Sequence, residues 1–228
     1  MTKIVVLKDL RSLFGEARNQ GPRPTCLAFA GSDAHAALRP GWKPLSCEFA
    51  FYHAQRRAGR PASRGALLSA TLEALRKDGQ PEEAGWPYLA ATPNDAASWA
   101  PPDDVGPLFG RAGEMRMPSL DKISQELDGD RPSILLLVLS RAFYAPSAEA
   151  VIHPAAGEQP DPARRHAVIA TAHGTVDGER AILVRNSWGL RWGAAGYGWL
   201  TETFLAPRLF AAAILTENAN VSARPAAA

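Results

Sequence analysis

The spacing of the apolar residues changes about halfway along the chain. In the first half they recur every three or four residues, which is the period of a helix with one buried face. After Pro132 they follow one another directly or alternate with polar residues, which is typical of buried and half-buried strands. The pattern therefore predicts an α+β protein, with helices in the first half and antiparallel strands in the second.

Three helices are predicted before residue 80. The first covers residues 26–38 and is stopped by Pro40. The second begins at Ser46, a residue type that favours the N-cap, and carries Glu48 in its first turn. The third covers about 66–77 and has leucines along one face.

The second half predicts a series of strands. Two of them flank the dipeptide Asp177-Gly178, which strongly favours a hairpin turn. The predicted strands cover residues 134–139, 166–172, 180–185, 196–200 and 210–215.

This order of elements predicts one domain of two lobes over residues 1–216. We expect a helical lobe over about 20–115 and an antiparallel, β-barrel-like lobe over about 116–216. Ligand clefts commonly lie where two such lobes meet, so we expect the active-site cleft between them. Residues 217–228 are expected to form a flexible tail.

Charge and composition exclude several classes of partner. The net charge of +2 over 228 residues gives no electrostatic reason to expect nucleic acid. No apolar run approaches the roughly 18 to 20 residues of a membrane span, and we see no signal peptide. Cys26 and Cys47 are the only cysteines, and no cysteine–histidine spacing is that of a zinc site. We therefore expect a cytoplasmic protein without a metal, a cofactor or a membrane partner.

Cys26 is the first candidate for chemistry. It opens the first predicted helix after a segment that Gly21, Pro22 and Pro24 keep out of helical structure. The N–H groups and dipole at a helix N-terminus lower the pKa of a thiol, and a thiolate is a nucleophile. The alternative is a buried cysteine that packs as a small apolar side chain, and Cys47 is expected to be of that kind.

A nucleophilic thiol requires an imidazole that removes its proton and later protonates the leaving amine. His166 begins one predicted strand and Asn186 ends the neighbouring strand of the same hairpin. The start of one strand and the end of its antiparallel neighbour lie at the same edge, so these two side chains can meet. The other histidines lack such a partner, and we assign them no catalytic role.

Several motifs together resemble the papain family of cysteine peptidases, from about residue 9 to 216. The most specific of them is an Asn-Ser-Trp-Gly block with Trp-Gly and Gly-Tyr-Gly after it. The resemblance is closer to bacterial members without a propeptide than to secreted eukaryotic ones. The matching residues are Gln20 six before Cys26, Leu45-Ser46, Gly65, Gly79, Trp86-Pro87-Tyr88, Arg165-His166-Ala167-Val168, Asn186-Ser187-Trp188-Gly189, Trp192-Gly193 and Gly196-Tyr197-Gly198.

The resemblance implies an endopeptidase that acts on a protein or peptide substrate without a cofactor. Cys26 would form an acyl-thioester, with His166 as general base and then acid. Asn186 would orient the imidazole, and Gln20 would donate to the oxyanion. The resemblance further implies a set of substrate-binding residues: Pro24, Gly65, Arg165, Ala167 and Trp188, of which Trp188 would also shield the histidine–asparagine contact.

Some positions depart from the family pattern. Arg23 replaces a cysteine of a family disulfide, and Pro24 replaces a glycine. Arg165 precedes the histidine, and we expect its charge to lower the pKa of His166. The long loop over 146–164 is a candidate lid, and control by a regulatory protein partner is expected in place of a propeptide. Two alternatives to peptide hydrolysis stay open: acyl transfer or deamidation by the same site, and an inactive papain-fold binding module.

Overall fold

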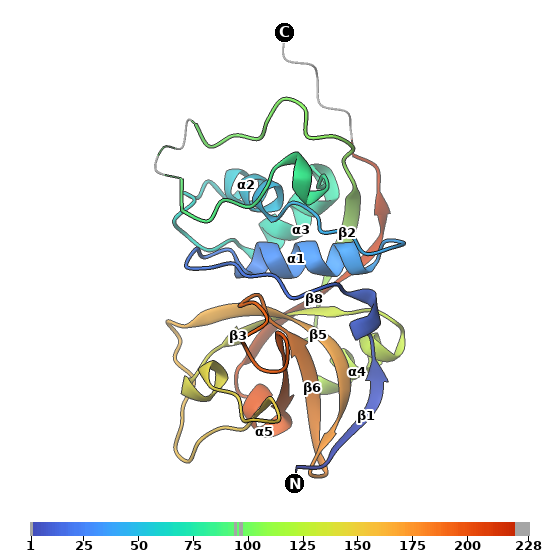
Figure 1. Cartoon of the computed structure of the whole chain (residues 1–228), viewed down its shortest axis with the longest axis vertical. Helices are drawn as coiled ribbons and strands as arrows, with labels where there is room; N and C mark the ends of the chain where they lie inside the picture. Colours follow the sequence, from blue (N-terminus) through green and yellow to red (C-terminus); the bar gives the residue numbers. More distant parts are fainter. Residues whose placement is uncertain (1, 94, 96–97, 222–228) are drawn as a thin grey trace. The chain divides into compact units, whose positions relative to one another are not determined.

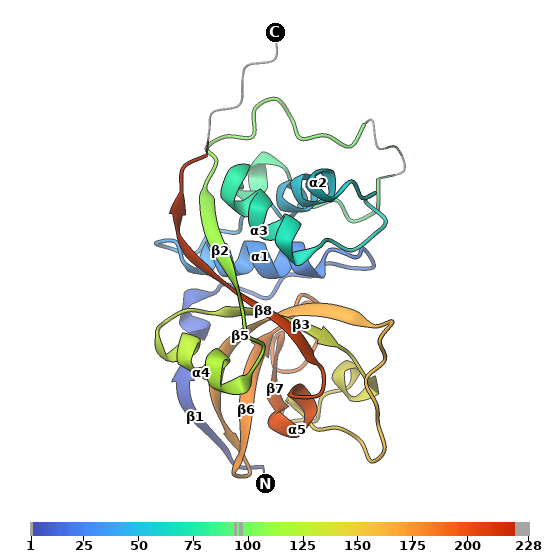
Figure 2. The same ribbon diagram turned by 180° about the vertical axis from the view of Figure 1, so that it is seen from behind.

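The computed structural model describes residues 2–93, 95 and 98–221, and these divide into two compact units (Figures 1 and 2). The helical unit comprises 20–114 and 215–221, and the strand unit comprises 2–19 and 115–214. Among the described residues, no helix is long and apolar enough to cross a lipid bilayer.

The three predicted helices are confirmed in the helical unit. They are α1 (Cys26–Ala37), α2 (Cys47–Ala58) and α3 (Leu68–Lys77). The predicted N-cap of α2 is also confirmed, because the Ser46 hydroxyl accepts a hydrogen bond from the Phe49 N–H at 3.1 Å. Every residue of α1 after Cys26 is buried, so this helix forms the centre of the unit rather than an amphipathic surface.

Aromatic side chains form much of the remaining core of the helical unit. Phe51 and Tyr52 of α2 contact Trp99, and Tyr52 also contacts Trp86. Trp86 and Trp99 come from the irregular segment after α3, which includes the 3-10 turn η2 (Glu83–Gly85). This segment therefore supplies core residues to the helical unit, although it has little regular structure.

The strand unit is built on one sheet. Its central hairpin is formed by β5 (Arg165–Val176) and β6 (Glu179–Arg185). Asp177 and Gly178 both have positive φ angles, of 50° and 85°, which confirms the predicted turn. The other strands are β1 (Ile4–Asp9), β3 (Ser133–Val138), β4 (Val151–Ile152), β7 (Tyr197–Thr201) and β8 (Leu209–Ala219), and the short helices are η1 (Arg11–Leu13), α4 (Leu120–Asp128), η3 (Arg141–Tyr144) and α5 (Glu202–Leu205).

The sheet is open, and the predicted barrel is wrong in this respect. The strand order is β2-β8-β3-β5-β6-β7-β4, with β1 paired to β5, where β2 is Gly110–Arg116. The strands at the two ends, β2 and β4, do not pair with each other. Closure requires the end strands to meet in register, and β4 is only two residues long. The pairing of β4 with β7 is parallel, whereas β5 pairs antiparallel with β1, β3 and β6, β3 with β8, and β6 with β7.

Strand β8 continues to Ala219, so residues 217–219 do not belong to a flexible tail as predicted. Figure 2 shows this last part of β8 beside β2, and the two strands are hydrogen-bonded neighbours. Gly110 of β2 permits the close approach, because a Cβ atom there would lie 2.4 Å from the Ala219 carbonyl oxygen. The tail prediction for 222–228 falls outside the described residues.

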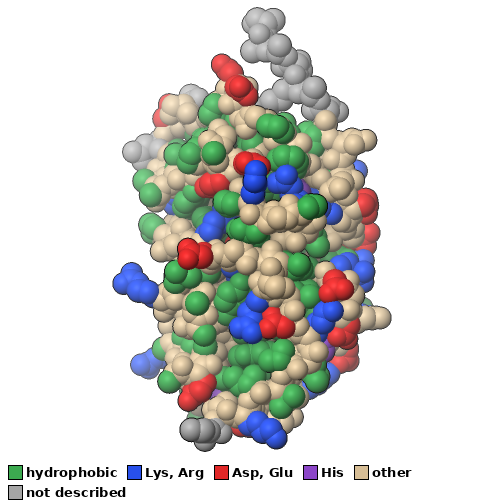
Figure 3. All heavy atoms as spheres, turned by 45° about the vertical axis from the view of Figure 1, so that its right-hand side comes forward, with side chains coloured by type: hydrophobic (Ala, Val, Ile, Leu, Met, Phe, Trp, Pro, Cys, Tyr) green, Lys and Arg blue, Asp and Glu red, His purple; other side chains and the backbone are tan. Residues whose placement is uncertain are grey.

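Acidic and basic side chains are mixed on the face shown in Figure 3, where they do not gather into a patch of one sign. This distribution agrees with a net charge close to zero.

Candidate active site

Cys26 is the first residue of α1, and it is half-buried and outside any disulfide. Thr25 occupies the N-cap but its side chain does not cap the helix. Its hydroxyl instead lies 2.8 Å from the phenol oxygen of Tyr88. The positive end of the helix dipole therefore acts on the thiol without a capping side-chain oxygen in between.

Gln20 is held in place at both its side chain and its backbone. Its side-chain Nε2 donates to the Arg23 carbonyl at 2.8 Å, and its own carbonyl accepts from the Tyr88 hydroxyl at 2.7 Å. The Thr25 N–H donates to the same Arg23 carbonyl at 2.9 Å. The segment from Gln20 to Cys26 is thus a tight turn organised around one carbonyl oxygen.

The side chain of Arg23 anchors this turn to α2. It is 1% exposed, and its Nη1 and Nη2 donate to the Glu48 carboxylate at 2.5 and 2.9 Å. Nη1 also donates to the Leu89 carbonyl at 2.6 Å. Glu48 accepts further bonds from the Trp99 Nε1–H at 2.7 Å and the Leu89 N–H at 3.1 Å. A buried ion pair therefore stands where the family pattern has a disulfide cysteine.

This ion pair is a feature that the sequence alone did not reveal. A signal for it exists: Glu48 stands in an apolar run of α2, and a buried carboxylate needs a cationic partner. The partner is 25 residues away, so no local pattern identifies it as Arg23.

Pro24 and Gly65 lie next to each other in the helical unit. A Cβ atom at Gly65 would be 3.8 Å from the Pro24 carbonyl oxygen, and both residues are partly exposed. Their shared position on one surface is compatible with the substrate wall expected for them.

His166 lies near the start of β5, and its Nε2 is 2.7 Å from the Asn186 Oδ1. The Ser187 N–H donates to the same Oδ1 at 2.8 Å, which identifies this atom as an acceptor. The Nε2 of His166 must therefore carry the hydrogen. In the neutral ring the lone pair is then on Nδ1, which is the atom left for proton abstraction.

Burial lowers the pKa of His166 to about 4, and the hydrogen bond to Asn186 opposes this only in part. The expectation that the charge of Arg165 lowers this pKa is wrong, because burial lowers it instead. Arg165 is exposed, and its guanidinium lies 5.4 Å from the centre of the Phe210 ring. The preceding Arg164 pairs with Asp161 at 2.9 Å, so neither arginine turns its charge to the imidazole.

Aromatic rings surround the histidine. The ring centre of Trp188 lies 4.7 Å from that of His166, and Phe143 lies 5.7 Å from it. Tyr144 stacks on Trp188 with ring centres 5.3 Å apart. Trp188 is predicted from the sequence, whereas Phe143 and Tyr144 come from the segment after β3, where no motif marks them. The rings exclude water from the imidazole and so cause its low pKa.

The structure divides the candidate residues between the two units. Ala167, next to His166, is 3% exposed and points to the opposite face of β5, so its contact with substrate stays a prediction. The helical unit holds Gln20, Pro24, Cys26 and Gly65, and the strand unit holds Arg165, His166, Ala167, Asn186 and Trp188.

A family model described as papain family cysteine protease matches residues 45–204. The matched range contains His166 and Asn186 and begins after Gln20 and Cys26. The match therefore covers candidate residues of the strand unit, and the candidate residues Gln20 and Cys26 of the helical unit lie outside it.

Curated relatives include Peptidase 1 of Dermatophagoides farinae, 26% identical over 196 residues, which are 84% of this chain and 59% of the relative. A cysteine protease of Blomia tropicalis is 27% identical over 194 residues, 80% of this chain and 56% of the relative. The chain thus spans less than two thirds of the length of these relatives.

Solved structures share the fold at lower identity. Xylellain, a cysteine protease from Xylella fastidiosa, superposes with a TM-score of 0.79 at 19% identity, covering 94% of this chain and 87% of that one. The bromelain protease of Ananas comosus, in complex with the E64 inhibitor, gives a TM-score of 0.68 at 19% identity, covering 91% and 97%.

Proposed function

Because this chain belongs to the papain family of cysteine proteases, we propose that it is an endopeptidase whose nucleophile is the thiol of Cys26. The contact between His166 and Asn186 is the observation that supports this most strongly. It fixes the hydrogen on Nε2 and leaves the Nδ1 lone pair as a base, in a part of the chain that the family model matches.

The proposed reaction uses these groups in sequence. Nδ1 of His166 takes the thiol proton as Sγ of Cys26 attacks the scissile carbonyl, and the protonated ring then gives that proton to the leaving amine. Water next attacks the acyl-thioester with the neutral ring again as base, the bond to Sγ breaks to release the carboxylic acid product, and the ring returns the proton to Sγ of Cys26. Because the pKa of His166 is lowered to about 4, the resting imidazole is neutral at pH 7 and ready to accept a proton.

Gln20 is proposed as an oxyanion donor beside the backbone N–H of Cys26. One of its amide hydrogens is fixed by the Arg23 carbonyl, which orients the group before the oxyanion forms. Such a preorganised donor is worth roughly 3 kcal/mol of the activation barrier. We expect Gln20→Ala to lower kcat by about 100-fold while the midpoint of urea unfolding stays close to wild type.

The substrate is proposed to be a peptide or protein, and the residues proposed to bind it are Pro24, Gly65, Arg165, Ala167 and Trp188. The cysteines are not joined in a disulfide, and a buried ion pair replaces the family's disulfide cysteine at Arg23. These features support work in a reducing compartment, and we propose the cytoplasm.

Hydrolysis of a fluorogenic peptide library tests the proposal. We expect cleavage by wild type and by Cys47→Ala, whose thiol is fully buried, and none by Cys26→Ala. A trapped acyl-enzyme on Cys26, seen by intact mass, identifies the intermediate. Amines added to the same reaction separate hydrolysis from acyl transfer. Cleavage that survives Cys26→Ala would contradict the proposal.

A further inference from the structure

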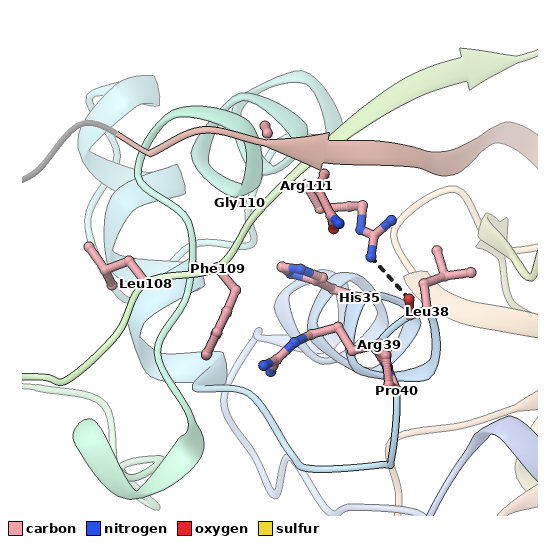
Figure 4. A pocket seen from close by; sticks show the side chains of 10 residues that line it. His35, Leu38, Arg39, Pro40, Leu108, Phe109, Gly110 and Arg111 are labelled. Carbon is pink, nitrogen blue, oxygen red and sulfur yellow. Dashed lines mark hydrogen bonds between the residues drawn. The ribbon is translucent and has the colours of Figure 1, made fainter.

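The helical unit contains a pocket of about 250 Å³ that the proposed peptidase site does not use. It lies between the C-terminal end of α1, the start of β2 and the end of β8. Figure 4 shows the side chains of His35, Arg39, Phe109 and Arg111 around it.

His35 is among the residues that line this pocket, and its side chain is fully buried. Its Nδ1 lies 3.1 Å from Gln80 Oε1. The Gln80 Nε2 donates to the Ser32 hydroxyl at 2.5 Å and to the Ser46 carbonyl at 2.9 Å, so Oε1 is the acceptor and Nδ1 carries the hydrogen. The His35 Nε2 then holds a buried lone pair without a hydrogen-bond partner among the described residues.

Arg111 brings an unpaired donor. Its Nη1 donates to the Thr216 carbonyl at 2.8 Å and its Nη2 to the Leu38 carbonyl at 3.0 Å, so the guanidinium is fixed at the end of α1. Its Nε–H is buried and has no partner in the described part of the chain. Unsatisfied buried groups of this kind are rare and costly in a folded protein.

A second cation, Arg39, is among the residues that line the same pocket. The guanidinium of Arg39 is 3.4 Å from the centre of the Phe109 ring, and no described residue forms an ion pair with it. None of the described residues that line the pocket is an aspartate or glutamate. The exposed Glu217 acts on Arg111 from outside the lining. Two cations without a facing carboxylate create a site that favours a negative charge.

We propose that this pocket binds a small oxyanion that also carries a hydroxyl group, such as hydrogen phosphate or a 2-hydroxy acid. The negative oxygens pair with the two guanidinium groups, and the hydroxyl donates to the Nε2 lone pair of His35. The cavity volume lies just below the range of about 300–1,000 Å³ typical of drug-sized ligands, which agrees with a small ligand.

Neutral His35 makes the site selective. An oxyanion without a hydroxyl leaves the Nε2 lone pair unsatisfied and places a negative oxygen against it. A site built to accept a hydrogen bond discriminates strongly against a ligand that lacks the donor. Hydrogen phosphate is therefore favoured over sulfate, and glycolate over acetate, at pH 7.

Calorimetric titration of the full chain with inorganic phosphate tests the proposal without reference to peptidase activity. At pH 7 and constant ionic strength, we expect phosphate to bind at least about 10-fold more tightly than sulfate. Arg39→Gln should weaken phosphate binding about 10-fold, as expected for one charged partner. Arg60→Gln, which removes the same charge from a half-buried arginine of α2's C-terminal loop, should not change it.

Titration at a lower pH tests the role of the His35 lone pair without a variant. As the pH falls toward 4, a growing fraction of His35 is protonated at Nε2 and becomes a donor, so sulfate should gain affinity and the preference for phosphate should shrink. Glycolate should likewise bind more tightly than acetate. Comparing the affinity of glycolate with that of phosphate then shows which of the two is the better ligand, and either result supports the proposed class. Equal affinity for phosphate and sulfate at pH 7, or binding that Arg39→Gln leaves unchanged, would overturn it, as would the absence of binding at millimolar concentrations.

Discussion

His35 in the helical unit and His166 in the strand unit are buried in the same way but have different surroundings. Each ring donates one N–H to a side-chain amide oxygen, that of Gln80 or of Asn186. In both cases a second hydrogen bond of the amide group identifies its oxygen as the atom that accepts from the ring. Burial lowers both pKa values to about 4.

The difference lies in what faces the second nitrogen. His166 is enclosed by aromatic rings such as Trp188, whereas His35 stands beside Arg39 and Arg111. An aromatic enclosure without a second charge suits a base that must give up its proton again. Cations beside an unpaired acceptor suit a bound anion. A perturbed pKa therefore marks an unusual environment, and the neighbouring groups decide which chemistry it serves.

The largest expected effect separates His166 from another histidine of the same strand. His166→Ala should reduce kcat/KM by about 1,000-fold, because it removes the general base and acid. His173→Gln is the matched control: His173 bonds to Asp128 near the far end of β5 and should change kcat/KM less than about threefold. Similar losses in both variants, measured with one peptide substrate, would mean that His166 acts through the fold of the strand alone.

A large loss of stability is expected from the helical unit's ion pair. Arg23→Met leaves the Glu48 carboxylate buried without its cation, and such an uncompensated charge costs about 3–5 kcal/mol of unfolding free energy. Adding Glu48→Leu should recover part of this loss, since no buried charge remains. Urea unfolding of both variants measures it, and an unchanged midpoint in Arg23→Met would show that Glu48 finds another partner.

A loss of stability that appears only at low pH follows from the two histidines together. The unfolded chain takes up protons near pH 6.5, whereas the buried rings resist protonation until about pH 4. Stability should therefore be complete above about pH 6.5 and fall as the pH drops toward 4, by up to about 3 kcal/mol for each ring. Urea unfolding between pH 7 and pH 5 measures this slope. A flat profile would show that neither ring is held neutral.

The smallest effect is expected at Arg165. Because it is exposed and burial sets the pKa of His166, the pH–rate profile of Arg165→Gly should superimpose on that of wild type. A shifted acid limb in kcat/KM would restore a role for its charge.

Local sequence predicted the elements that carry the proposed chemistry. The Asp177-Gly178 dipeptide predicted the turn of the hairpin. The hairpin places the Nε2 of His166 2.7 Å from the Oδ1 of Asn186. The helix that starts at Cys26 followed in the same way from the prolines before it and the apolar run after it.

Contacts between distant residues were not predictable. Arg23 and Glu48 are 25 residues apart, and Arg111 binds Leu38 across 73 residues, so no periodic pattern connects them. The end of β8 carries polar residues that are typical of a tail, yet its backbone pairs with β2. Pairing partners of this kind depend on the assembled fold.

The rate at which Cys26 reacts with a substrate-like thiol electrophile tests the central claim most directly. Intact-mass labelling is followed in wild type, Cys26→Ala, Cys47→Ala and His166→Ala. We expect one fast label that persists in Cys47→Ala, disappears in Cys26→Ala and forms far more slowly in His166→Ala. Slow labelling that His166→Ala leaves unchanged would contradict the proposal that the two side chains form one catalytic site.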